Sequence, residues 1–164
     1  MSNPVSAIPK GYHSLTPYIT CKDAPRAIDF YKQIFGATEI MRMPGPGGLI
    51  THAELRIGDS VIFLCDEIPG MAKAPDGTSI NPVSLFLYTE DVDSLWKRAV
   101  DAGCKVNMAL ADMFWGDRYG KFSDPFGHTW SVATHIEDVA PEEMQRRSEE
   151  WKANMAKAAG AGQS

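Results

Sequence analysis

Two sets of side chains in this chain of 164 residues could take part in catalysis or ligand binding. They are a histidine–carboxylate pair and a group of aromatic rings. His52 and Glu54 stand two residues apart in an alternating segment, so on a strand they would share one face. Such a pair could begin a metal site or act as a general acid and base, and it could equally be a solvated strand face. His128 follows a turn, where we expect a surface residue or a hydrogen bond within the turn. No nucleophile-elbow serine and no phosphate-binding loop is present.

Aromatic residues suggest a different chemistry. Tyr18, Phe86 and Tyr88 fall on one side of alternating segments, and Trp115 follows Phe114 just before another such segment. An aromatic cleft with a few hydroxyl groups suits a flat organic molecule, although the same rings could simply fill the cleft as core. Arg118 could bind a carboxylate or phosphonate of a ligand, or form a salt bridge between two parts of the chain.

Alternating apolar residues and turn signals predict elements that occur in the same order twice. Asp23 and Asp91 each cap a predicted helix, and Gly58 and Gly127 each lie in a predicted hairpin turn, at nearly the same offset. The predicted strands cover residues 15–21, 38–42, 50–56 and 61–65, and then 83–89, 105–109, 117–122 and 129–135.

We therefore predict an α+β fold in which two βαβββ modules have curled mixed sheets that form a cleft, followed by a C-terminal helix. The predicted divisions are a leader at 1–13, a first module at 14–66, a linker at 67–82, a second module at 83–135, and a helix and tail at 136–164. The helix begins near Pro141 and carries a sparse apolar stripe that could pack on its own domain or on a partner subunit.

Composition excludes several classes of protein. The net charge of −5 argues against a nucleic-acid partner, which would require a basic surface. The sequence contains no apolar run of membrane-spanning length and no signal peptide at the first residues, so no membrane partner is expected. Three widely spaced cysteines indicate reduced thiols, and we expect a cytoplasmic protein.

Three features together resemble a known family. They are the duplicated unit, the segment from Ala27 to Ala37, and the turn Asp124-Pro125-Phe126-Gly127-His128. They resemble the glyoxalase/bleomycin-resistance/extradiol-dioxygenase superfamily, also called the vicinal oxygen chelate fold, and residues 114–120 resemble its PhnB-like branch. The resemblance implies a cleft between curled sheets and a homodimer. The superfamily includes metal-dependent isomerases, lyases and dioxygenases, and also metal-free proteins that sequester drugs.

The resemblance also implies positions for the metal ligands of the enzymatic members. These positions fall at Thr16, Ser84 and Ser131. In the internal repeat, the position of Ser131 corresponds to Ile62 in the first module. None of these side chains is a competent ligand for a divalent transition metal, which binds imidazole, thiolate or carboxylate. We therefore expect no metal and no other cofactor.

The predicted function is the capture of a small organic molecule, aromatic or apolar, in the cleft without the usual metal. The alternatives are a lyase, isomerase or dioxygenase-type enzyme with a non-standard metal or acid–base site, and a dimeric scaffold whose cleft is filled. No catalytic residue is predicted. The predicted ligand-binding residues are Thr16, Tyr18, His52, Glu54, Ser84, Phe86, Tyr88, Trp115, Arg118 and Ser131.

Overall fold

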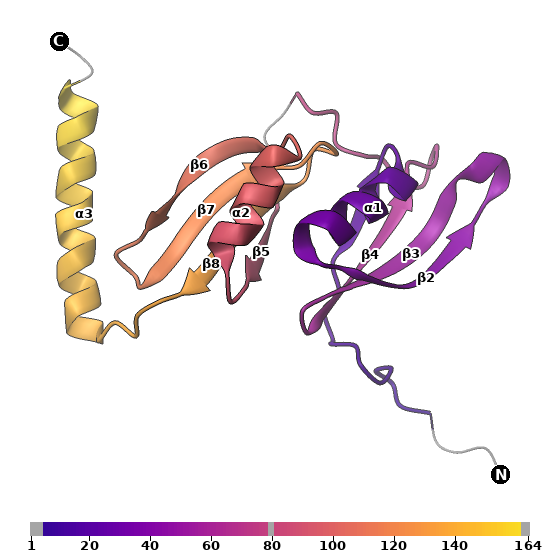
Figure 1. The fold of residues 1–164 in the computed structure, drawn as a ribbon, viewed down its shortest axis with the longest axis horizontal. Coiled ribbons are helices and arrows are strands. Elements are labelled where there is room, and N and C mark those ends of the chain that lie inside the picture. The colour runs from indigo at the N-terminus through magenta and orange to yellow at the C-terminus, as the bar shows by residue number, and fades with distance from the viewer. Residues whose placement is uncertain (1–4, 79–80, 162–164) are drawn as a thin grey trace.

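The computed structural model describes residues 5–78 and 81–161 and shows two βαβββ modules followed by a helix, as predicted (Figure 1). The first module consists of β1 (Tyr18–Cys21), α1 (Ala24–Phe35), β2 (Thr38–Pro44), β3 (Ile50–Ile57) and β4 (Ser60–Asp66), with a short 3-10 turn at Pro46–Gly48. The second consists of β5 (Ser84–Tyr88), α2 (Val92–Asp101), β6 (Lys105–Asp112), β7 (Asp117–Ser123) and β8 (Thr129–His135), and α3 (Pro141–Ala161) follows. No helix in the described part of the chain is both long and apolar enough to cross a bilayer.

The two sheets have the same topology. Their strand orders are β1-β4-β3-β2 and β5-β8-β7-β6, in which the first strand of each module pairs in parallel with the last and the other pairs are antiparallel. β1 begins at Tyr18, three residues later than predicted, directly after Pro17. A proline has no N–H to donate to a ladder, although the Pro17 carbonyl still accepts a hydrogen bond from the Phe63 N–H.

Both helices begin at the aspartates that the sequence indicated. The Asp23 carboxylate accepts a hydrogen bond from the Arg26 N–H at 3.1 Å, and Asp91 accepts one from the Ser94 N–H at 3.0 Å. α1 ends at Gly36, whose left-handed φ of 65° is accessible to glycine at little cost. These local signals fix the ends of each helix and therefore the face that each presents to its sheet.

Each helix covers one face of its own sheet, as Figure 1 shows for α1 and α2. Ile19 and Cys21 of β1 and Leu55 and Ile57 of β3 lie buried on the helix side. The alternate residues lie on the opposite face, which we call the open face of each module. This pattern confirms the predicted alternation, because neighbouring strand residues point to opposite sides.

The two modules share one core that is centred on the buried carboxylate of Asp124. One carboxylate oxygen accepts hydrogen bonds from the backbone N–H groups of Phe126 and His128, both at 2.9 Å. The other accepts from the Trp130 indole at 2.9 Å and from the Tyr31 hydroxyl at 2.7 Å. Tyr31 belongs to α1, so a carboxylate of the second module is held in part by the first.

Further contacts cross the same boundary. The rings of Phe35 and Trp130 lie 4.4 Å apart between centroids, and the His128 imidazole donates to the Thr20 carbonyl at 2.9 Å. His128 is therefore buried between the modules and not on the surface, while its backbone makes the hydrogen bond within the turn that was the other expectation. The turn that carries the family resemblance thus serves to join the two halves of the chain.

Between β4 and β5, the described residues form no helix or strand beyond an isolated bridge of Ile68 with Ala72. This stretch coincides with the predicted linker at 67–82, of which residues 79–80 lie outside the described residues. Residues 1–4 of the predicted leader and 162–164 of the predicted tail also lie outside them.

We predict that Tyr31→Phe lowers the free energy of unfolding by about 1.5–3 kcal/mol, the range for a hydrogen bond to a charged group. The substitution removes one donor from a carboxylate that water cannot reach. Urea unfolding would measure the change. Tyr18→Phe is the matched control, because that residue is 54% exposed and its hydroxyl contacts His52 and no buried carboxylate, so the loss should stay at or below about 1 kcal/mol. Equal midpoints for the two variants would contradict this role for Asp124.

Candidate functional site

The ten predicted ligand-binding residues separate into groups in the structure. Tyr18, His52 and Glu54 lie together on the open face of the first module. The open face of the second module brings together Ser84, Phe86, Tyr88, Trp115 and Ser131. Thr16 lies between the modules, and Arg118 lies on the opposite side of its sheet.

The first group forms a continuous chain of hydrogen bonds. His52 Nδ1 lies 3.0 Å from the Tyr18 hydroxyl, and His52 Nε2 lies 3.1 Å from Glu54 Oε1. The Tyr12 hydroxyl donates to the other Glu54 oxygen. Tyr12 was assigned to the leader, because no periodicity marks it as part of a site. His52 and Glu54 therefore do share a face, as predicted, and they bind each other there.

Glu54 shows the electrostatic effect of this chain. Glu54 is only 9% exposed, and burial by itself would raise the pKa of its carboxyl group. The hydrogen bonds from Tyr12 and His52 outweigh burial and lower the pKa overall. Conversely, the hydrogen bond to Glu54 raises the pKa of Tyr12. The face is a set of mutually satisfied polar groups.

Three members of the second group, Phe86, Tyr88 and Trp115, line a cavity of about 430 Å³ that we call the Trp115 pocket. Phe86 and Tyr88 on β5 are 51% and 59% exposed, so their rings are available to a ligand. Tyr119 lies under Phe86 with a centroid distance of 5.7 Å and an interplanar angle of 25°. The lining residues are Phe86, Tyr88, Met108, Met113, Trp115, Asp117, Tyr119 and Trp151.

A buried carboxylate anchors this pocket. Asp117 is 3% exposed and accepts hydrogen bonds from the Tyr88 hydroxyl and from the Trp115 indole N–H, both at 3.0 Å. His135 Nδ1 lies 2.8 Å from its other oxygen, and His135 Nε2 lies 2.9 Å from Asp138. The hydrogen bond to Asp117 raises the pKa of Tyr88. The carboxylates of Asp138 and then Asp117 raise the pKa of His135.

Sequence reasoning missed several of these residues. Asp117 stands at the first position of β7, where alternation alone does not distinguish a pocket residue from a solvated one. His135 and Tyr119 are not among the ten predicted residues. The pairing register of the strands could have identified them. Asp117 of β7 pairs with His135 of β8, and Tyr119 of β7 and Tyr88 of β5 both pair with Ala133 of β8.

Three hydroxyl groups continue the open face beyond the pocket. Ser131 Oγ lies 3.0 Å from Ser84 Oγ and 3.0 Å from the Tyr119 hydroxyl. Two of the positions implied as metal ligands, Ser84 and Ser131, are thus in direct contact. Thr16 and Ser84 line one further cavity of about 280 Å³ between the modules.

These hydroxyl groups do not fit a divalent transition metal, since neutral hydroxyls are weak ligands compared with imidazole or carboxylate. Across residues 5–78 and 81–161, no three His, Cys, Asp or Glu side chains are grouped so that they could hold a metal ion. The fourth implied position, Ile62, is buried in the core. Phe63 is the true counterpart of Ser131, because it pairs with Tyr18 as Ser131 pairs with Phe86. The turn between β7 and β8 is longer than the turn between β3 and β4. An alignment of the two turns therefore places the counterpart of Ser131 one residue too early, at Ile62.

Arg118 is not part of either open face. Its guanidinium binds Asp93 on α2 at 2.7 Å and Asp112 on β6 at 2.9 Å. Both partners belong to the second module, so the alternative expectation of a bridge between modules is wrong. The odd and even residues of β7 point to opposite sides, which places Asp117 and Tyr119 on the open face and Arg118 on the helix side.

Two features set the position of the loop before β7. Gly116 has a φ of 96°, and its carbonyl accepts hydrogen bonds from the N–H groups of Ile136 and Glu137. A Cβ atom at Gly116 would lie 2.1 Å from the Glu137 carbonyl oxygen, so only glycine allows this close approach. The loop that carries Trp115 is thereby held against the segment that leads into α3.

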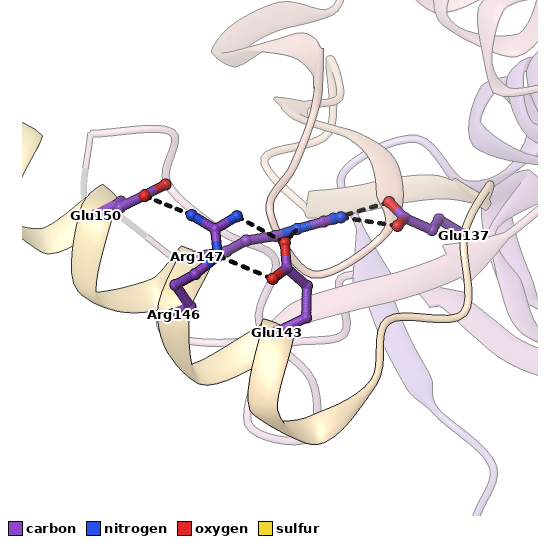
Figure 2. Close-up of polar contacts among 5 residues, drawn as sticks. All are labelled: Glu137, Glu143, Arg146, Arg147 and Glu150. Atoms are coloured by element: carbon purple, nitrogen blue, oxygen red, sulfur yellow. Dashed lines mark hydrogen bonds and ion pairs between the residues drawn. The ribbon is translucent and has the colours of Figure 1, made fainter.

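The helix α3 supplies the outer wall of the pocket. Trp151 lines the cavity and packs on Phe114, with ring centroids 5.7 Å apart. Arg147 holds the first turns of the helix with two bonds of 2.8 Å to Glu137, outside the helix (Figure 2). This guanidinium lowers the pKa of Glu137. Arg146 binds only Glu143 and Glu150, which belong to α3 itself (Figure 2).

Comparisons with known proteins agree with this architecture. A family model described as the Glyoxalase/Bleomycin resistance protein/Dioxygenase superfamily matches residues 12–132. An uncharacterized protein of Mycobacterium bovis is 42% identical over 136 residues, which cover 80% of this chain and 90% of that protein.

Solved structures show the same fold. TioX from Micromonospora sp. ML1 is 26% identical, with a TM-score of 0.60 over 74% of this chain and 98% of TioX. A PhnB protein from Bacillus cereus is 16% identical, with a TM-score of 0.60 over 74% of this chain and 99% of its own. At 16% identity, the likeness to the PhnB protein shows a shared fold and nothing more.

We predict that Arg147→Gln loosens α3, whereas Arg146→Gln does not, because Arg147 binds Glu137 outside the helix and Arg146 binds Glu143 and Glu150 of the helix itself. An exposed ion pair contributes at most about 1 kcal/mol, so amide hydrogen exchange in the first turns of α3 should accelerate by at most about fivefold. Hydrogen exchange with mass spectrometry would measure this. Identical exchange in the two variants would show that the Glu137 contact does not hold the helix.

Proposed function

This chain belongs to the Glyoxalase/Bleomycin resistance protein/Dioxygenase superfamily, and from that premise we propose that it binds a small, flat, aromatic or apolar organic molecule in the Trp115 pocket, without the metal of the enzymatic members. The observation that carries the proposal is an aromatic floor beside a cavity, formed by the exposed rings of Phe86 and Tyr88 and the half-buried ring of Tyr119. Exposed rings grouped around a cavity favour a ligand over a filled scaffold.

The chemistry of the implied metal positions supports the same proposal. Thr16, Ser84 and Ser131 offer hydroxyl groups, which can orient an organic ligand by hydrogen bonds but bind metal weakly. In the pocket itself, the Tyr88 and Trp115 donors already point at Asp117 and fix the orientation of both rings. The site is thus preorganised before a ligand arrives.

A second candidate function rests on the first module. The His52–Glu54 pair with its two tyrosines has the composition of an acid–base site, and a lyase or isomerase could use it. Binding in the Trp115 pocket and loss of that binding on substitution there favour the first candidate. Turnover that depends on His52 would favour the second.

The proposal includes a cytoplasmic C2 homodimer of the PhnB-like branch. Large apolar side chains remain exposed on both modules outside the pocket, including Met43 at 50% and Val100 at 42%. A second copy is a simple way to cover such surfaces, and twofold symmetry is the commonest closed arrangement. The segment from Phe114 to Gly120 supports the branch.

We predict that acridine, a flat tricyclic probe, raises the melting temperature of the protein by mass action. Phe86→Ala should weaken acridine binding by roughly two- to twelvefold, the loss of about 0.5–1.5 kcal/mol of aromatic contact. Fluorescence titration would measure the dissociation constant. Val106→Ala is the matched control, because Val106 is an exposed apolar residue of the same sheet outside the pocket lining. Equal losses in both variants, or no binding at all, would refute the site.

We predict that native mass spectrometry of the purified protein shows a dimer without stoichiometric Zn, Ni, Fe or Mn. A chelator should then leave the melting temperature unchanged, since no set of three imidazole, thiolate or carboxylate ligands exists in the described part of the chain. About one metal ion per chain, lost with His52→Ala, would overturn the proposal and support the enzyme.

A further inference from the structure

The charge carried by the lining of the Trp115 pocket is negative. Among the residues that the structure describes, Asp117 is the only charged member of its lining, and no lysine or arginine lines it. The hydrogen bonds from Tyr88 and Trp115 are neutral and leave the carboxylate charge in place. Lys121, four residues after Asp117 on β7, also lies on the open face, but it is not part of the lining.

His135 does not cancel this charge. Its imidazole lies between two carboxylates, at 2.8 Å from Asp117 and 2.9 Å from Asp138. Two carboxylates and at most one imidazolium leave a net negative charge in either protonation state of the histidine. Because Asp117 is buried at 3% exposure, solvent screens its charge less than it screens an exposed one.

The aromatic rings add to this negative potential. The face of an aromatic ring is the negative end of its quadrupole. Phe86 stacks on Tyr119 at 25°, and Tyr88 lies 4.8 Å from Phe86, so three rings form a floor. Trp115 is inclined at 67° to Tyr119 as a wall, and Trp151 of α3 contributes a second wall. A molecule on the floor therefore meets ring faces and lies beside a carboxylate.

We propose that the Trp115 pocket selects a planar organic cation, such as a fused heteroaromatic ring with a delocalised positive charge. The inference rests on the proposed binding function and adds the charge of the ligand. A compact metal cation does not fit, because ring faces and the thioethers of Met108 and Met113 cannot replace its water shell. A delocalised cation is weakly hydrated and gains both stacking and attraction from the rings.

The test compares three probes of nearly the same shape on the full chain. They are N-methylacridinium, acridine at a pH where it is neutral, and acridine-9-carboxylate. In the wild-type protein, N-methylacridinium should bind roughly three- to thirtyfold more tightly than acridine, the range expected from the attraction of a cation to aromatic rings. The carboxylate should bind most weakly. Added salt should reduce the preference for the cation.

Two variants locate the source of the preference. Asp117→Asn removes the carboxylate charge while keeping the shape, and it should reduce the preference for the cation to the part that the aromatic rings supply. Asp112→Asn is the matched control, because Asp112 pairs with Arg118 at 2.9 Å and is absent from the pocket lining, and it should keep the wild-type preference.

The outcomes separate the inference from the proposed function. Equal binding of acridine and N-methylacridinium by the wild-type protein, or tighter binding of the carboxylate, would overturn the inference and leave the binding function standing. No binding of any probe would refute both. Because the ranking in the wild-type protein decides the result, it stands even if Asp117→Asn fails to fold.

Discussion

The structure depends on a buried carboxylate that belongs to one half of a duplicated chain and is satisfied in part by the other. Asp124 accepts four hydrogen bonds, and one of them comes from Tyr31 on the helix of the first module. An ionised group in the core costs a large desolvation free energy unless its hydrogen bonds are complete. The two modules must therefore meet in one orientation, in which α1 packs against β8 and its turn.

That orientation leaves the two open faces free to differ. In the first module, Tyr12, His52, Glu54 and Tyr18 satisfy one another, so their polar groups stabilise the face more than they invite a ligand. In the second module, the hydrogen bonds of Tyr88 and Trp115 run to the buried Asp117, while Phe86 and Tyr88 remain more than half exposed. One duplicated unit thus carries two different surfaces, because the residues that alternate toward the open face are unconstrained by the shared core.

The segments outside the repeat complete the pocket of the second module. Gly116 brings the Trp115 loop against residues 136–137, and Arg147 ties α3 to Glu137, so Trp151 reaches the cavity. The match to the superfamily ends at residue 132, before any of α3. The fold is common to the family, whereas this wall belongs to the part of the chain beyond the match.

The helices and strands could be predicted from the amino-acid sequence, because their signals are local. Asp23, Asp91 and Gly36 mark the helix ends, and the alternation through Ala53 and Leu55 decides which face of β3 is buried. The site could not be predicted in this way, because its contacts join residues far apart in the chain. Tyr88 meets Asp117 across 29 positions, and Tyr12 meets Glu54 across 42. Arg118 and Ile62 were misplaced for the same reason, since the face and register of a strand are set by the partners that pack on it.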